Sequence, residues 1–391
     1  MKIFLSKSFI VFHLIFWYNF IILYGQPADY IAEKFSEVKS ITCTSVKNQN
    51  KSLTCWSFAV ISMIESDLIK EGKGEYDLSE MYIVHQAYID KAERYVRMHG
   101  TINFSGGGAL NDPIDVIRKY GIIPTKVYNG LKDGNLIINH LAMDAALKDN
   151  ISIKIKNKIL SASWKENFIG VLDSYMGNIP LKFTYDNSEY TPLTFASMLG
   201  INPDNYILFT SYTHHPYYQK FILEVPDNWS WGKSYNLPLS EFQEIIDKSL
   251  ENGFSVAIAC DLTEKGFLWK EGIALALDHS KKRKDSINNN GTLISNDSLK
   301  NPLDEVAVTP KIRQEAFDNY ETTDDHDFHI VGIVKDQNSK KFYVAKNSWG
   351  AEGTRYGGFI YISENYLLYK ALNVLVNKKA LSSKILEKIG L

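Results

Sequence analysis

Cys55 stands at the start of an apolar segment with helical spacing, and it is one of three cysteines in 391 residues. Phe58, Ile61, Ile64 and Leu68 recur at intervals of three to four, which predicts a mostly buried helix with Cys55 in its first turn. The macrodipole and the unpaired N–H groups of a helix N-terminus favour a thiolate. Gln49 lies six residues earlier, where its side-chain amide and the Cys55 N–H could stabilise an oxyanion. Cys55 could therefore be a nucleophile.

Other roles for a cysteine compete with this interpretation. A buried cysteine beside aromatic residues is often a packing residue. Cys43, Cys55 and Cys260 are an odd number, so at least one thiol stays free and no disulfide scaffold is expected. No Cys-x-x-Cys or His-Glu-x-x-His occurs, and His326 with His329 lacks a nearby third ligand. We therefore expect no metal and no cofactor.

A longer motif separates these alternatives. Val46-Lys47-Asn48-Gln49 followed by Cys55-Trp56-Ser57-Phe58-Ala59 resembles the active-site segment of the papain superfamily of cysteine peptidases. The resemblance implies a Cys-His-Asn site, with Cys55 as nucleophile and Gln49 as an oxyanion donor. It also implies a histidine on a strand of the second half, followed by an asparagine before Ser-Trp-Gly.

Both downstream features are present. Asn347 precedes Ser348-Trp349-Gly350, and the family pattern of a histidine, five residues and a glycine selects His326 with Gly332. In an extended strand an offset of three turns His326 and His329 to opposite faces, so only one of them can face the cleft. The resemblance gives Asn347 the task of orienting His326, and gives Trp349 the task of shielding that pair from water. His329 is then expected to be a core residue.

Gly107 and Gly108 lie before a Tyr120-Gly121-Ile122 segment at a spacing that also resembles papain-like enzymes. There a glycine pair lines the cleft, where missing side chains let a substrate backbone pair with the loop. A plain flexible turn is the alternative.

The distances point to one branch of the superfamily. His326 follows Cys55 by 271 residues (326 − 55), against about 130–150 in papain relatives, which leaves a large insertion. With Ser52 where secreted relatives have a disulfide cysteine, the chain resembles bleomycin hydrolase and bacterial aminopeptidase C. In that branch the C-terminal carboxylate holds the substrate's amino group, which would make Leu391 the anchor. That branch also forms hexamers, so a homo-oligomer is implied.

The elements that must position these residues follow from periodicity. Helices are expected from Thr54 to Lys70, from Ser79 to Arg97 and from Asn111 to Tyr120, and residues 130–200 are expected to be mainly helical. Short strands are expected from about 205, including His329–Lys335 and Lys341–Lys346 around a hairpin turn. Residues 281–301 suggest a mobile surface loop.

The fold implied is α+β: a papain-like two-lobed fold with a helical N-terminal lobe, an antiparallel β-barrel-like C-terminal lobe and a large mainly helical insertion. The peptidase domain would span 26–391, with the helical lobe at about 40–200, the β-rich lobe at about 201–377 and a tail at 378–391.

The first 25 residues differ from the rest. Lys2 and Lys7 precede an apolar run from Phe9 to Tyr24, which is typical of a secretory signal peptide ending near Gly25. An uncleaved signal anchor is the alternative. We expect a secreted or periplasmic protein that does not stay at a membrane after cleavage. A net charge of -2 gives no reason to expect a nucleic-acid partner.

The function expected is therefore hydrolysis of peptide bonds by a cysteine peptidase, acting on peptides as an aminopeptidase. An endopeptidase of the same fold and a non-catalytic peptide-binding module are the alternatives.

Overall fold

The fold is described by a computed structural model of the chain over residues 35–132, 137–278 and 305–391. The expected signal peptide, and the expected surface loop at 281–301, lie outside the described residues. No helix in these described ranges is both long enough and apolar enough to cross a membrane.

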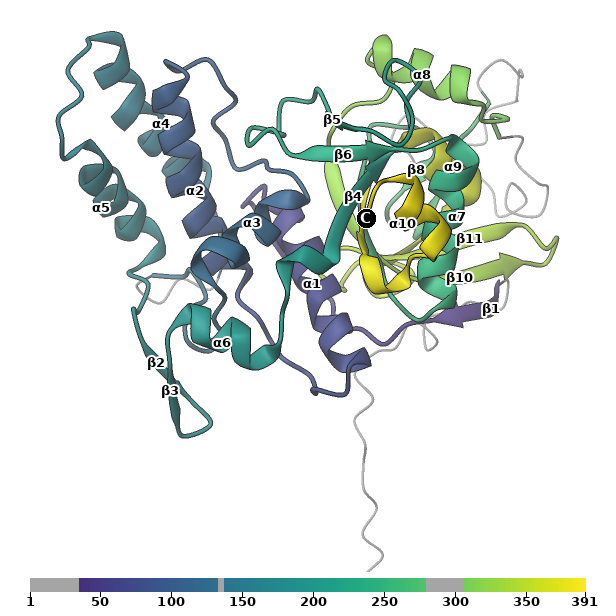
Figure 1. The fold of residues 1–391 in the computed structure, drawn as a ribbon, viewed down its shortest axis with the longest axis horizontal. Coiled ribbons are helices and arrows are strands. Elements are labelled where there is room, and N and C mark those ends of the chain that lie inside the picture. Colours follow the sequence, from purple (N-terminus) through teal and green to yellow (C-terminus); the bar gives the residue numbers. More distant parts are fainter. Residues whose placement is uncertain (1–34, 133–136, 279–304) are drawn as a thin grey trace, which may run out of the picture.

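The first half of the chain is mainly helical (Figure 1). Its helices are α1 (Cys55–Lys70), α2 (Glu80–Arg97), α3 (Asn111–Tyr120), α4 (Leu141–Lys156), α5 (Trp164–Met176) and α6 (Pro192–Leu199). The predicted start of α2 is confirmed, because the Ser79 side chain accepts a hydrogen bond from the Tyr82 N–H and caps the helix. The prediction for 130–200 omitted one element, a hairpin of β2 (Phe183–Tyr185) and β3 (Ser188–Tyr190).

In the described residues, the second half and the N-terminal strand β1 together build an 11-stranded, mainly antiparallel sheet. Its strands are β1 (Phe35–Ser40), β4 (Tyr206–Thr210), β5 (Lys220–Ile222), β6 (Lys233–Asn236), β7 (Val256–Cys260), β8 (Phe267–Leu268), β9 (Ile273–Ala274), β10 (His326–Asp336), β11 (Lys341–Lys346), β12 (Phe359–Ser363) and β13 (Ala371–Asn377). Their order is β5-β6-β4-β13-β7-β10-β11-β12-β9-β8, and β1 pairs with β10. The long strand β10 is central, because it pairs with β1, β7 and β11.

Short helices cover the sheet. These are α7 (Leu239–Glu251), α8 (Pro310–Asp318), α9 (Glu364–Lys370) and α10 (Ser383–Lys388), with 3-10 turns η2 (Pro203–Asn205) and η4 (Lys378–Ala380). Apolar side chains of α7, among them Phe242 and Ile246, share one buried cluster with Ile258 of β7 and Phe328 of β10. The α+β class and the papain-like fold expected from the sequence are therefore confirmed.

Helix α1 joins the two halves. It packs against α2 and α3 on one side and against β7 and β10 on the other. Residues Cys55 to Leu68 are all buried, which explains why the helix carries apolar residues around most of its circumference. The N-terminus of α1 therefore meets the sheet near the start of β10, where His326 stands.

Candidate active site

Cys55 is the first residue of α1, as the sequence predicts. Its thiol differs from the expectation in one respect, because it is 9% exposed and donates a hydrogen bond to Oδ2 of Asp327 at 3.3 Å. Within the described residues no hydrogen bond joins it to His326. Burial, and then the charge of Asp327, raise the pKa of the Cys55 thiol well above its usual range. In this arrangement the sulfur is a protonated thiol, despite its place at a helix N-terminus.

His326 and Asn347 meet where β10 begins and β11 has just ended. The ring Nε2 of His326 lies 2.7 Å from Oδ1 of Asn347. Since that oxygen only accepts, Nε2 carries the proton, and Nδ1 is the unprotonated nitrogen of the neutral ring. Burial lowers the pKa of His326 to about 4, although the hydrogen bond to Asn347 opposes this shift. The ring is thus held as a neutral base.

His329 has a different partner. Its Nδ1 lies 2.8 Å from Oγ of Ser62 in α1, and the residue is 1% exposed. The ammonium of Lys346 also donates to Ser62 at 2.7 Å. Burial, and then the charge of Lys346, lower the pKa of His329 well below its usual range. His329 is the core residue that strand alternation predicts, and the two histidines do not form a joint metal site.

Gln49 is attached to the loop that follows Asn347. Its Oε1 accepts from Oγ of Ser348 at 2.9 Å, and its backbone N–H donates to the Ser348 carbonyl at 2.7 Å. An adjacent bridge joins Asn48 to Trp349. Because the amide oxygen is occupied, the Nε2 donors of Gln49 remain for another acceptor. The loop before Cys55 and the loop after Asn347 are therefore held together.

Trp349 packs on the histidine. Its ring centroid is 4.7 Å from that of His326, with an interplanar angle of 49°. Trp269 extends this cover, 5.0 Å from Trp349. The geometry fits the shielding expected of Trp349.

Gly107 and Gly108 are glycines because other side chains occupy their Cβ space. A Cβ at Gly107 would lie 2.1 Å from Oδ2 of Asp227, and one at Gly108 would lie 2.8 Å from the Trp56 ring. The Trp56 Nε1–H donates to the Gly106 carbonyl at 2.9 Å. The missing side chain of Gly107 thus makes room for a carboxylate, which the sequence did not indicate.

Leu391 is not brought to Cys55. The tail is held on the β-rich half, where Lys388 Nζ lies 2.6 Å from Oε1 of Glu241 in α7. Leu391 lines a pocket with Arg118 of α3 and Tyr235 of β6, and no lining residue of that pocket is Cys55, His326 or Asn347. These contacts hold Leu391 among residues other than those of the Cys55 site. The prediction that Leu391 anchors the substrate amine gains no support from them.

Sequence reasoning missed the carboxyl groups around the thiol. Asp327 is 4% exposed, its Oδ1 has no hydrogen-bond partner in the described part of the chain, and burial followed by the charge of Asp324 raises its pKa well above the usual range. Burial, and then the charge of Asp227, raise the pKa of Asp324 to about 8. The run Asp324-Asp325-His326-Asp327 was the available signal, because it places carboxyl groups on both sides of the histidine.

Known proteins resemble this chain over most of its length. Aminopeptidase E of Lactobacillus helveticus is 23% identical over 87% of this chain and 82% of its own. Bleomycin hydrolase of Mus musculus is 21% identical, again over 87% and 82%. These relatives support a papain-like cysteine peptidase of this branch.

A solved structure agrees with the assignment to this branch at the level of fold. Pepw from Lactobacillus rhamnosis superposes with a TM-score of 0.66 at 18% identity, over 93% of this chain and 86% of that one. No protein-family model matches the chain. The branch expected from the Cys55 motif and the distance to His326 is confirmed.

Proposed function

We propose that the chain is an aminopeptidase that cleaves peptides through Cys55, His326 and Asn347. The observation that carries the proposal is the 2.7 Å contact of His326 Nε2 with Asn347 Oδ1. His326 is the first residue of β10, and the next residue, Asp327, accepts the hydrogen bond of the Cys55 thiol. A nucleophile, a base and a group that orients the base then share one site. The names of the relatives, which include aminopeptidases and bleomycin hydrolase, support the same activity.

The reaction follows from these groups. His326 Nδ1 takes the thiol proton, and the Cys55 sulfur bonds to the peptide carbonyl carbon. The electron pair moves to the carbonyl oxygen, which the Cys55 N–H and the Gln49 amide stabilise. The C–N bond then breaks as His326 protonates the leaving amine. Water, deprotonated by His326, attacks the thioester, releases the acid and restores the thiol form of the site.

Asp327 is the group that we propose restricts cleavage to the N-terminal residue. The amino nitrogen of an N-terminal residue lies about 2.5 Å from its own carbonyl carbon, and that carbon must approach the sulfur to about 3–3.5 Å. Oδ2 of Asp327 is 3.3 Å from the same sulfur. A substrate ammonium therefore comes within reach of the Asp327 carboxyl group, whose Oδ1 has no partner among the described residues.

This contact also suggests how binding activates the nucleophile. While the thiol donates to Asp327, it does not give its proton to His326. A substrate ammonium beside Asp327 favours the ionised form of this carboxyl group and competes with the thiol for its oxygen. The freed thiol can then turn to the unprotonated nitrogen of His326.

Hydrolysis by the thiol is tested first. We expect an epoxysuccinyl inhibitor to label Cys55 and Cys55→Ala to abolish hydrolysis of aminoacyl substrates, while Cys260→Ala retains it. Full activity in Cys55→Ala rules out the mechanism. Labelling without turnover across a broad aminoacyl panel favours the peptide-binding alternative.

The amine anchor is tested separately with peptides that have free or acetylated N-termini. Asp327→Asn should raise KM for free peptides and reduce their advantage over acetylated ones. Removal of Leu391 and Gly390 should leave both unchanged if Asp327 is the anchor, and should produce endopeptidase cleavage if Leu391 is. Equal cleavage of both peptide sets by the unaltered enzyme identifies an endopeptidase.

A further inference from the structure

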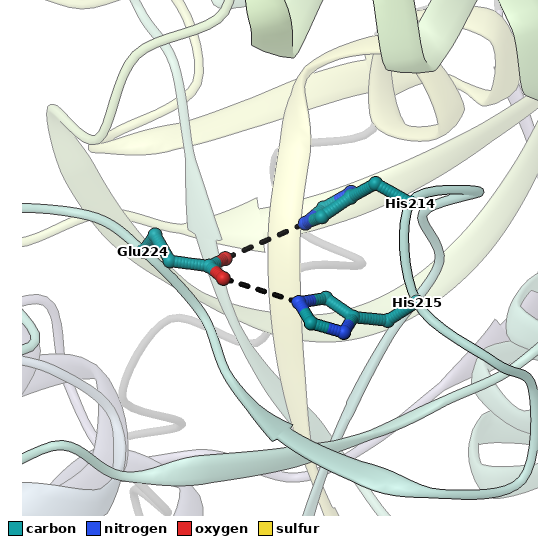
Figure 2. Close-up of side chains that lie close together, drawn as sticks. All are labelled: His214, His215 and Glu224. Carbon is teal, nitrogen blue, oxygen red and sulfur yellow. Dashed lines mark hydrogen bonds and ion pairs between the residues drawn. The ribbon is translucent and has the colours of Figure 1, made fainter.

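A cluster of metal-binding side chains lies outside the Cys55 site. His214 and His215 are on the loop between β4 and β5, and Glu224 follows β5 (Figure 2). One ligand atom from each of the three residues lies within 4.8 Å of the other two. All three side chains point toward one another in Figure 2. An adjacent histidine pair does not match a spaced zinc motif, which is why the sequence motifs alone do not indicate this cluster.

A buried glutamine determines which nitrogen of His214 carries the proton. Oε1 of Gln314 accepts from the backbone N–H of Thr213 at 2.6 Å and of His214 at 3.3 Å. Since backbone N–H groups only donate, this atom must be the amide oxygen. The same oxygen lies 3.1 Å from Nδ1 of His214, so Nδ1 is the donor. In the neutral ring, Nε2 then carries no proton and presents a lone pair.

That lone pair faces a carboxylate. Nε2 of His214 is 3.4 Å from Oε2 of Glu224, and Nε2 of His215 is 3.1 Å from Oε1 of the same residue. A lone pair and a carboxylate repel each other unless a proton or a metal cation lies between them. One divalent cation shared by the three groups avoids this repulsion.

The spacing also suits zinc. Zn–N and Zn–O bonds of about 2.0–2.2 Å in tetrahedral geometry place neighbouring ligand atoms roughly 3.3–3.5 Å apart. Each histidine nitrogen lies about one such edge from a Glu224 oxygen, His214 Nε2 3.4 Å from Oε2 and His215 Nε2 3.1 Å from Oε1. Aromatic rings orient the ligands, because Phe221 stacks on His215 at 4.2 Å and Phe317 on His214 at 5.8 Å.

We propose that His214, His215 and Glu224 bind one Zn²⁺ ion, with solvent in the fourth position. Gln314 then acts as the outer partner that orients a ligating histidine. The His214 and Glu224 side chains are 30% and 56% exposed, so the ion can enter from solvent. The site does not depend on the proposed peptidase activity. It ties the loop after β4 to the segment after β5, and three residues beyond Glu224 the side chain of Asp227 fills the space beside Gly107.

Zinc binding is measured by calorimetry and metal analysis on the full chain in a Cys55→Ala background, so that the cysteine beside His326 does not bind the metal. We expect one equivalent of Zn²⁺, and with Co²⁺ the visible absorption of a tetrahedral site. Removal of an outer partner typically weakens metal binding about 10–100-fold, so Gln314→Ala should do so. His215→Ala and Glu224→Gln should weaken it at least as much.

The matched control is His99→Asn, an exposed histidine in the helical half whose backbone φ of 55° asparagine tolerates. It should bind zinc like its parent. Thermal melts without metal establish that each variant is folded. The proposal is overturned if no equivalent binds, or if affinity survives in His215→Ala and Glu224→Gln. It is also overturned if proton NMR shows an imidazolium–Glu224 pair that zinc does not displace.

Discussion

Asp327 is the residue that most affects the state of the Cys55 sulfur. It follows the neutral base His326 along β10 and accepts the thiol hydrogen bond, so it keeps the proton on sulfur until something else occupies the carboxylate. A carboxylate at this distance acts against the helix N-terminus, which favours the thiolate. The resting enzyme should therefore react slowly with general thiol reagents.

Asp327→Asn should make Cys55 more reactive. The substitution replaces an ionisable carboxyl group by an amide that can donate to the sulfur, so the thiol pKa falls, and each unit of decrease raises the thiolate fraction at neutral pH about tenfold. Iodoacetamide alkylation measured against pH should shift to lower pH. An unshifted profile in Asp327→Asn contradicts the assigned contact. Faster alkylation together with a raised KM would separate nucleophile reactivity from substrate binding.

Ser348→Ala tests whether Gln49 must be held. Loss of an oxyanion donor costs roughly 10²–10³-fold in kcat, which is the loss expected of Gln49→Ala. Ser348→Ala leaves the amide in place but frees it to rotate, so a kcat loss of about tenfold at unchanged KM is expected. Steady-state kinetics of both variants provide the check. Equal losses in both would mean that Ser348 does more than position Gln49.

Part of the candidate site could be predicted from single residues and short motifs in the sequence. The Gln49–Cys55 spacing and the Asn347-Ser348 motif are local patterns, and strand alternation separated His326 from His329, which pairs with Ser62. The Asp327 contact could not be predicted, because it joins residues 272 apart in sequence through the packing of α1 on β10. The catalytic roles themselves stay predictions until the variants are measured.

At the scale of elements, the loop before α1 is held from two sides. Gln49 is fixed to Ser348 on the β-rich half, and Lys51 exchanges backbone hydrogen bonds with Ile138 and His140 at 3.2 and 3.1 Å. The helical insertion expected from the long Cys55–His326 distance therefore supports the active-site loop directly. Periodicity predicted the helices of that insertion but not this contact, since backbone pairing between isolated loop residues has no sequence period.

His140→Leu tests the second support. His140 is 4% exposed, and neither ring nitrogen has a hydrogen-bond partner among the described residues. Burial lowers its pKa to about 4 from 6.5. Between these values the unfolded chain binds more protons, so the unfolding free energy falls as pH falls.

The leucine variant lacks this loss. Between pH 7 and pH 4, the unaltered chain should therefore lose roughly 3 kcal/mol more unfolding free energy than His140→Leu loses. Urea unfolding at several pH values in this range measures the difference. Parallel curves for the two proteins would show that the pKa of His140 is the same in the folded and the unfolded chain.

At the scale of the whole molecule, a buried ionic cluster joins the N-terminal arm to both leading helices. Lys47 Nζ lies 2.6 Å from Oε1 of Glu80 in α2 and 3.4 Å from Oε1 of Glu65 in α1. Glu65 is fully buried and also accepts from Thr44 at 2.6 Å. One cation therefore balances two buried carboxylates on different helices.

Lys47→Met should lower the unfolding free energy by about 3–5 kcal/mol, because it leaves buried charges without a partner. Lys182→Met removes an exposed pair with Glu189 and should leave stability unchanged within error. Denaturant unfolding of both variants supplies the comparison. If Lys47→Met is as stable as the control, the cluster contributes nothing to holding the helices.

The bridge between Asn48 and Trp349 has a consequence for biosynthesis. The loop before Cys55 pairs with Trp349, about 300 residues downstream. While the ribosome is still translating the middle of the message, Cys55 has neither its base nor the backbone that holds its loop. Under the proposed mechanism, a growing chain therefore cannot digest itself or its neighbours before Trp349 has been translated.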